Sequence, residues 1–170
     1  KMGYIFEDII RRFSENAEAG DHYTPREVIR LMTRLLLAEG CDDLEQNKKE
    51  VPILDMACGT GGMLSTSYSY LKKANPSLQV RLFGQEINHE SYAMCLADML
   101  IKGQDEKNII GGMQTADTSG EVNNLVKDPG DTLKYDCFPE QKMRFVIINP
   151  PFGTPWAGKD AKEGQEEAVR

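Results

Sequence analysis

Four consecutive residues, Asn149-Pro150-Pro151-Phe152, combine two hydrogen-bond acceptors with an aromatic face. Proline fixes its own φ and biases the preceding residue toward an extended conformation. The side-chain oxygen of Asn149 and the carbonyl oxygen of Pro150 can therefore point the same way, as two acceptors for the hydrogens of an exocyclic amine. Phe152 offers a flat face on which a planar substrate can stack. The alternative is a proline-rich turn that merely closes a strand, and a glycine motif upstream weighs against it.

That motif is a glycine-rich turn with the sequence DMACGTGG, which starts at Asp55. Glycine allows a tight turn and a close approach of a ligand to the backbone, and we expect the missing side chain of Gly61 to leave room for a cofactor. A second acidic residue, Glu86, ends the next predicted strand, where a carboxylate can accept hydrogen bonds from a ribose diol. The G-x-G-G pattern favours S-adenosylmethionine over a nicotinamide nucleotide, although a plain strand–helix turn is the simpler alternative. The predicted cofactor contacts here are Asp55, Ala57, Gly59, Thr60, Gly61, Gly62 and Glu86.

The periodicity of the chain predicts an open parallel α/β sheet. Short apolar runs bounded by glycine and proline indicate buried strands, and apolar residues at helical spacing indicate helices between them. This alternation is typical of parallel strands joined by right-handed crossovers. The predicted strands cover residues 51–57, 79–85, 107–110 and 143–148, and the predicted helices run from the glycine turn to residue 74 and from residue 88 to residue 103.

Two amphipathic helices are predicted ahead of the first strand. The first covers residues 5–13. The second is expected to begin with Thr24 as the N-cap, Pro25 at the first helical position and Glu27 completing a capping box. Its apolar stripe is expected to face the core, and Gly40 to follow its last turn. The stripe consists of Val28, Leu31, Met32, Leu35 and Leu36.

The length and net charge of the chain restrict the functions that it can have. The chain has 170 residues, about one domain, with 20 basic and 27 acidic side chains and a net charge of −7. That charge argues against a nucleic-acid footprint over the whole surface, but not against a local basic patch or a partner subunit that supplies one. The four cysteines are too far apart for a CxxC motif, and we expect reduced thiols. No apolar run is long enough to span a membrane and no leader is evident, so a soluble, cytoplasmic protein is expected.

The order of these motifs resembles a known family. DMACGTGG, an acidic residue after the next strand and NPPF are together similar to the amino-methyltransferases that act on adenine N6 or cytosine N4. The segment around Tyr23-Thr24-Pro25 resembles the G-x-[FY]-[FY]-T-P segment of the modification subunit of type I restriction–modification systems, which methylates adenine in bacterial or archaeal DNA. The resemblance covers most of residues 4–155.

The resemblance implies further contacts with S-adenosylmethionine. In this family the Thr-Pro segment approaches the methionine end of the cofactor, so Tyr23, Thr24 and Pro25 become candidates. An acidic residue after the third strand lies near the cofactor's adenine. Asp131 in the sequence GDTL matches that position, and Asp117 is the second choice.

The resemblance also implies a reaction and its partners. The substrate would be double-stranded DNA, with the target adenine flipped out of the duplex because its amine is inaccessible in the stack. Asn149 and Pro150 would accept the two amine hydrogens while Phe152 stacks on the base. A separate specificity subunit would read the DNA sequence, and a restriction subunit is a further expected partner.

The implied fold is a Rossmann-like S-adenosylmethionine-dependent methyltransferase fold, incomplete in this chain and preceded by short helices. We expect a helical segment with the Tyr-Thr-Pro motif at residues 1–40, a partial catalytic domain at 51–155, and a charged, disordered tail at 156–170. Because further strands of the family's sheet would be missing, the chain alone is expected to be inactive on DNA.

Three other functions fit parts of the pattern. A methyltransferase acting on a protein glutamine amide, or on an RNA base amine, would use the same pair of acceptors. The Tyr-Thr-Pro segment argues against both. A non-catalytic scaffold with a cofactor-binding fold is the third, and the combination of an intact glycine turn with NPPF argues against it.

Overall fold

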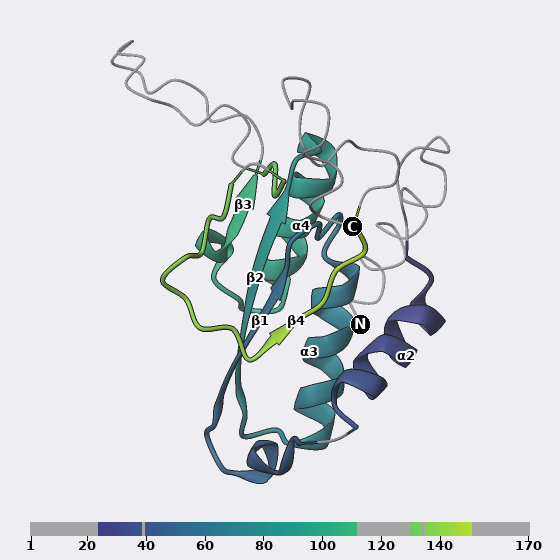
Figure 1. Ribbon diagram of the computed structural model, residues 1–170, viewed down its shortest axis with the longest axis vertical. Helices are drawn as coiled ribbons and strands as arrows, with labels where there is room; N and C mark the ends of the chain where they lie inside the picture. The colour runs from purple at the N-terminus through teal and green to yellow at the C-terminus, as the bar shows by residue number, and fades with distance from the viewer. Residues whose placement is uncertain (1–23, 39, 112–129, 134, 151–170) are drawn as a thin grey trace, which may run out of the picture.

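The core of the fold is a four-stranded, fully parallel sheet with the strand order β3-β2-β1-β4 (Figure 1). The computed structural model describes residues 24–38, 40–111, 130–133 and 135–150. The strands are β1 (Glu50–Asp55), β2 (Gln79–Glu86), β3 (Ile109–Gly111) and β4 (Phe145–Val146).

The register places the carboxyl ends of the strands at one edge of the sheet. Leu54 near the end of β1 pairs with Phe83 of β2 on one side and with Val146 of β4 on the other. From β1 the chain moves to β2 and then β3, whereas β4 lies on the opposite side of β1. In open α/β sheets ligands bind outside the carboxyl ends of the strands, where the strand order reverses. The ends of β1 and β4 are therefore the expected position of a site.

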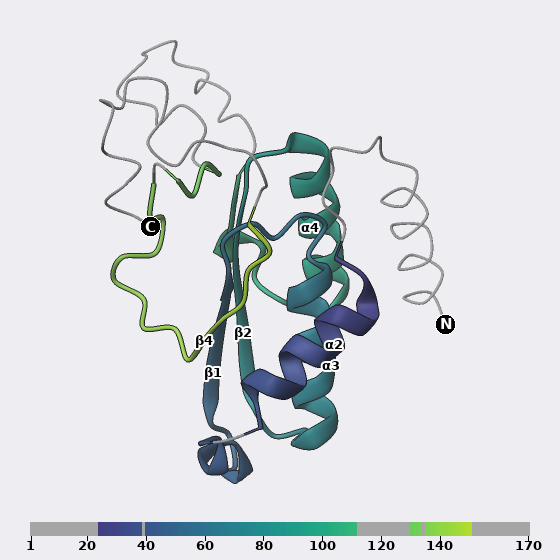
Figure 2. The ribbon, with the colours of Figure 1, turned by 45° about the vertical axis from the view of Figure 1, so that its right-hand side comes forward.

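Three helices cover one face of the sheet (Figure 2). The opposite face is crossed by the segment that leads into β4. There the ring of Phe138 packs edge-on against Phe83 of β2 at 5.3 Å between centroids, and Gln85 Nε2 donates to the Tyr135 carbonyl at 3.0 Å. The helices are α2 (Arg26–Leu36), α3 (Gly62–Ala74) and α4 (His89–Ile101), with short 3-10 helices at Asp42–Glu45 and Glu106–Asn108.

The hydrophobic core lies between the sheet and these helices. Apolar side chains of β1 and β2 meet those of α3 and α4, and full burial of each stabilises the fold by about 1.5–3 kcal/mol. Its most buried members are Val51, Ile53, Leu64, Leu71, Leu82, Cys95, Met99 and Ile109.

Most of the predicted elements are confirmed. Asn88 caps α4 as expected, because its Oδ1 accepts from the Ser91 N–H at 2.9 Å, and Gly103 follows that helix with a φ of +66°. The strand predicted at 143–148 is shorter than expected, since only Phe145–Val146 has strand geometry. The helix predicted at 5–13, the tail at 156–170 and residues 112–129 lie outside the described residues.

The predicted start of α2 is wrong. The N-cap residue is Pro25, no side chain caps the helix, and Glu27 pairs instead with Arg30 on the exposed surface. The hydroxyl of Thr24 instead accepts a hydrogen bond from Asn149, far along the chain. A tertiary contact has thus replaced the local cap.

The predicted core-facing stripe of α2 is also largely wrong. Leu31 and Leu35 are 57% and 66% exposed, and the buried residues are Ile29 and Thr33. The Thr33 hydroxyl lies 3.2 Å from that of Ser67 on α3. Hydropathy does not reveal this buried polar contact. With Ile29 and Thr33 turned inward, α2 is rotated so that most of its apolar side chains face outward.

Because α2 is rotated in this way, truncation of two leucines should lower the free energy of unfolding in urea by different amounts. Leu64→Ala should lower the free energy of unfolding by about 2–5 kcal/mol, because Leu64 is fully buried and its truncation leaves a cavity. Leu35→Ala should change it by about 0.5 kcal/mol or less, because that side chain is exposed. Equal losses in the two variants would mean that the outer face of α2 is part of the core.

Candidate functional site

Three segments meet the carboxyl ends of the strands: the glycine turn after β1, the end of β2, and the extension of β4. Backbone hydrogen bonds fix the glycine turn. The Cys58 N–H donates to the Gln85 carbonyl at 3.0 Å, and the Gly61 N–H donates to the Cys58 carbonyl at 2.8 Å. Helix α3 then begins at Gly62, so its first N–H groups lie beside the strand ends.

The two glycines with positive φ in this turn face different surroundings. Gly59 has a φ of +54°, and a Cβ added to it would meet no atom within 4 Å. Gly61 has a φ of +84°, and its Cβ would lie 2.9 Å from the Cys95 sulfur. The expectation that Gly61 leaves room for a cofactor is therefore wrong: its missing side chain makes room for α4. Gly59 is the glycine that borders open space.

Glu86 joins the glycine turn to the end of β2. Its Oε2 accepts from the Gly59 N–H at 2.7 Å, and its Oε1 accepts from the Asn88 N–H at 2.7 Å. Hydrogen bonds from N–H groups to an ionised carboxylate are roughly twice as strong as neutral ones. Each carboxylate oxygen has a second acceptor position, so Glu86 can hold the turn and still accept from a ligand hydroxyl.

Asp55 is fully buried at the end of β1, and its two oxygens differ. Oδ1 accepts from the Ala57 N–H at 3.1 Å, whereas Oδ2 has no hydrogen-bond partner within the described part of the chain. Burial raises the pKa of Asp55 to about 7; the Ala57 N–H opposes this shift and the charge of Glu86 adds to it. A buried acceptor without a partner beside a glycine that borders open space fits a cationic or hydrogen-donating ligand.

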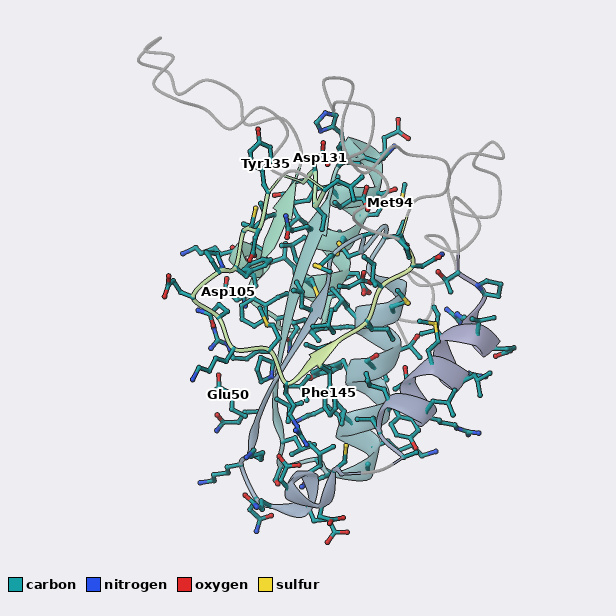
Figure 3. The ribbon with its side chains drawn as sticks, in the orientation of Figure 1. Glu50, Met94, Asp105, Asp131, Tyr135 and Phe145 are labelled. Carbon is teal, nitrogen blue, oxygen red and sulfur yellow. The ribbon has the colours of Figure 1, made fainter. Side chains whose placement is uncertain are left out.

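The segment that contains Asp131 lies across the ends of β1 and β2. A Cβ at Gly130 would overlap the Glu86 carbonyl oxygen, so glycine permits this close approach. The Thr132 hydroxyl donates to the Met56 carbonyl, and Asp131 Oδ1 accepts from the Leu133 N–H at 3.2 Å. Figure 3 shows Asp131 at the end of the sheet opposite Glu50, the first residue of β1. Asp117, the second choice, lies outside the described residues.

Asn149 extends from β4 toward the same edge. The Ile147 N–H donates to the Leu54 carbonyl at 2.9 Å, which continues the pairing with β1. Two residues later, Asn149 Nδ2 donates to Thr24 Oγ1 at 2.9 Å. Asn149 and Thr24 are half-buried and Pro150 is exposed. Tyr23, Pro151 and Phe152 lie outside the described residues.

The remaining predicted contacts lie in or beside the turn. Thr60 is half-buried and Gly62 exposed, where α3 begins, and a Cβ on Gly62 would meet Ile29 of α2 at 3.8 Å. Pro25 is exposed at the start of α2. The structure thus brings the described members of the predicted site to one edge of the sheet.

Sequence reasoning missed the pair formed by Cys58 and Cys95, whose sulfurs are 3.9 Å apart in the core. The hydrogen bond to Cys95 and burial raise the pKa of the Cys58 thiol well above its usual range. Such a thiol stays protonated and unreactive near neutral pH. We therefore assign the cysteine pair a packing role beneath the glycine turn. None of the four cysteines forms a disulfide. The described residues contain no cluster of three His, Cys, Asp or Glu side chains placed to bind a metal ion.

Comparison with known proteins decides the family. The sequence matches the N-6 DNA Methylase family over residues 1–169. The chain belongs to this family. The turn, Glu86 and Asn149 all lie within the matched residues.

Relatives of this chain include two restriction-enzyme subunits. The type I restriction enzyme MpnII methylase subunit of Mycoplasma pneumoniae is 30% identical over 99% of this chain. The type I restriction enzyme EcoEI methylase subunit of Escherichia coli is 26% identical over 89% of it. The chain spans 28% and 27% of the lengths of these relatives.

A solved structure shows the same fold. It is the type I restriction-modification system methyltransferase subunit from Streptococcus thermophilus, which is 24% identical and superimposes with a TM-score of 0.64. The match covers 90% of this chain and 28% of that structure. The Rossmann-like methyltransferase fold expected from the sequence is confirmed. None of the helices in the described part of the chain is long and apolar enough to cross a membrane.

The buried Asp55 predicts a pH dependence of stability. Its pKa is raised in the folded chain, so between about pH 4 and 7 the folded state binds the proton more tightly than the unfolded state. The contribution of Asp55 to the free energy of unfolding should therefore fall as pH rises through this window, by at most about 1.4 kcal/mol per pH unit.

The Asp55→Asn variant tests this dependence. An amide does not ionise, so the variant should gain stability relative to the parent chain as pH rises from 4 to 8 in urea unfolding. Asp42→Asn, at an exposed aspartate, is the control and should show no such trend. A stability difference between Asp55→Asn and the parent that stays constant over this range would contradict the assignment.

Proposed function

We propose that this chain is the cofactor-binding and amine-binding part of a site-specific DNA adenine-N6 methyltransferase, the modification subunit of a type I restriction–modification system. The observation that carries the proposal is the position of Asn149 beside the glycine turn, at the ends of neighbouring strands. An acceptor for an amine and a turn that borders open space are then on one edge of the sheet. Family membership and the names of the relatives support the same function.

We propose S-adenosylmethionine as the cofactor, because the residues present fit it. Asp55 Oδ2 is a buried acceptor without a described partner, and Gly59 borders open space. Glu86 would accept from the ribose and Asp131 would lie near the adenine of the cofactor. When bound, S-adenosylmethionine supplies a methyl group on a positively charged sulfur. The other proposed contacts are Tyr23, Thr24, Pro25, Ala57, Thr60 and Gly62.

The NPPF segment would hold the target base. Asn149 Oδ1 and the Pro150 carbonyl would accept the two amine hydrogens and direct the nitrogen lone pair out of conjugation with the ring. Phe152 would stack on the base, with Pro151 holding it in place. The adenine must leave the duplex to reach these acceptors. Positioning of this kind can supply most of the rate acceleration for a transfer that needs no strong base.

We propose that double-stranded DNA, a specificity subunit and a restriction subunit are the partners, and the cytoplasm is the location. Four free cysteines fit a reducing compartment. The net charge of −7 fits a division of labour in which a partner supplies much of the phosphate contact. Residues 51–155 would form the catalytic part and residues 1–40 the helical segment before it.

The decisive experiment is methyl transfer by the full-length protein with its specificity subunit. The complex is incubated with labelled S-adenosylmethionine and with DNA, RNA or protein as the substrate. The methylated product is identified by mass spectrometry. N6-methyladenine in DNA is the expected product. Methylated glutamine or RNA would replace the proposed substrate, and cofactor binding without transfer to any of them would indicate a scaffold.

Asn149→Ala should abolish methylation while leaving the affinity for the cofactor within about threefold of the parent. The variant loses an acceptor that is used most fully in the transition state, and such losses appear in kcat. Asn47→Ala, at an exposed asparagine, is the control. A loss of activity that only follows a loss of cofactor affinity would make Asn149 a structural residue.

Gly59→Ala should weaken cofactor binding roughly tenfold or more in calorimetry of the full-length protein, because the new methyl group enters the space proposed for the ligand. Gly103→Ala is a matched control: Gly103 has a similar positive φ and open surroundings, but follows the opposite end of α4. Both variants carry the same backbone strain. Equal affinities for the two would place the cofactor elsewhere.

A further inference from the structure

The hydrogen bond between Asn149 and Thr24 joins two motifs that lie 125 positions apart. Nδ2 of Asn149 donates and Oγ1 of Thr24 accepts, at 2.9 Å. Thr24 stands just before α2, whereas Asn149 stands just after β4. Neither motif predicts this contact, because each is local in the sequence.

A carboxamide has an accepting end and a donating end, and only the accepting end suits an amine. Rotation of the Asn149 side chain by half a turn would direct its NH₂ group at the amine hydrogens, where donor would face donor. The pairing of β4 with β1 fixes the backbone near Asn149, but the last torsion of an asparagine side chain is broad. Something must therefore hold the NH₂ end of Asn149.

We propose that Thr24 is a positioning residue for Asn149: by accepting from Nδ2, its hydroxyl turns Oδ1 toward the target amine. The inference rests on the proposed function, in which Asn149 accepts hydrogens from a substrate amine. A threonine hydroxyl that accepts from Asn149 keeps its own hydrogen to donate. The role is thus compatible with an additional contact between Thr24 and the cofactor.

The packing of α2 against α3 holds Thr24 in place. The Pro25 carbonyl accepts from the Ile29 N–H at 3.1 Å, and Ile29 is buried against the start of α3. One turn further along α2, the Thr33 hydroxyl contacts Ser67. Helix α2 therefore carries the acceptor for Asn149 on a support that also borders the glycine turn.

The test compares three variants in the full-length subunit with its specificity partner. Thr24→Val removes the hydroxyl at nearly constant shape, Thr24→Ser keeps it, and Thr33→Val removes the hydroxyl contact between α2 and α3. Single-turnover methyl transfer and cofactor affinity are measured for each. Thr24→Val should slow transfer roughly 10- to 100-fold, by a clearly larger factor than any loss of cofactor affinity. Thr24→Ser should recover most of the rate, and Thr33→Val, which alters only the packing of α2, should slow transfer less than Thr24→Val.

Three results would overturn the proposal. An unchanged rate in Thr24→Val would show that Asn149 needs no partner. A loss of rate that matches a loss of cofactor affinity would make Thr24 a cofactor contact only. Equal losses of transfer rate in Thr24→Val and Thr33→Val would show that the rate depends only on the packing of α2.

A second readout separates this inference from the proposed function. In the full-length subunit with ¹⁵N-labelled asparagine, the side-chain amide signals of Asn149 are assigned by their loss in Asn149→Ala. They should shift in Thr24→Val and return in Thr24→Ser; no shift would refute the contact. If the parent protein methylates RNA or glutamine instead of DNA, the proposed substrate fails, and the variants are compared on that amine with the same expectations.

Discussion

The carboxylate of Glu86 organises the carboxyl edge of the sheet. It holds the Gly59 N–H of the turn after β1 and the Asn88 N–H at the start of α4. Three elements thus meet at one buried group at the end of β2. Burial raises the pKa of Asp55 to about 7, and the negative charge of Glu86 adds to this shift. A ligand that engages either carboxylate would therefore affect the other.

Residues whose roles follow from local chemistry could be predicted from the sequence. Strand periodicity locates β1 and β2 to within about two residues, and Asp55 and Glu86 stand at the observed ends of these strands. The capping of α4 by Asn88 is a contact within a few residues of the chain. The prolines beside Asn149 restrict the backbone, so its position after β4 could be predicted, whereas its role as an acceptor stays a prediction.

Residues whose roles depend on packing between distant segments could not be predicted. Gly61 matches a cofactor motif, but Cys95 of α4 occupies the space beside it. Thr24 has the local pattern of an N-cap, and only the fold brings Asn149 to its hydroxyl. The rotation of α2 depends on the contact of Thr33 with Ser67, two polar residues that hydropathy assigns to the surface. In each case a single distant neighbour outweighs a local preference.

The contact of Gly61 with Cys95 has a consequence for engineering the turn. Gly59 borders open space, so a redesign for bulkier cofactor analogues has freedom on that side. A side chain at position 61 would have to displace the Cys95 sulfur, with Met99 close behind it. Libraries that randomise the two glycines together would therefore lose most members to misfolding. A smaller residue at position 95 would relieve the clash but not the backbone strain at the positive φ of position 61.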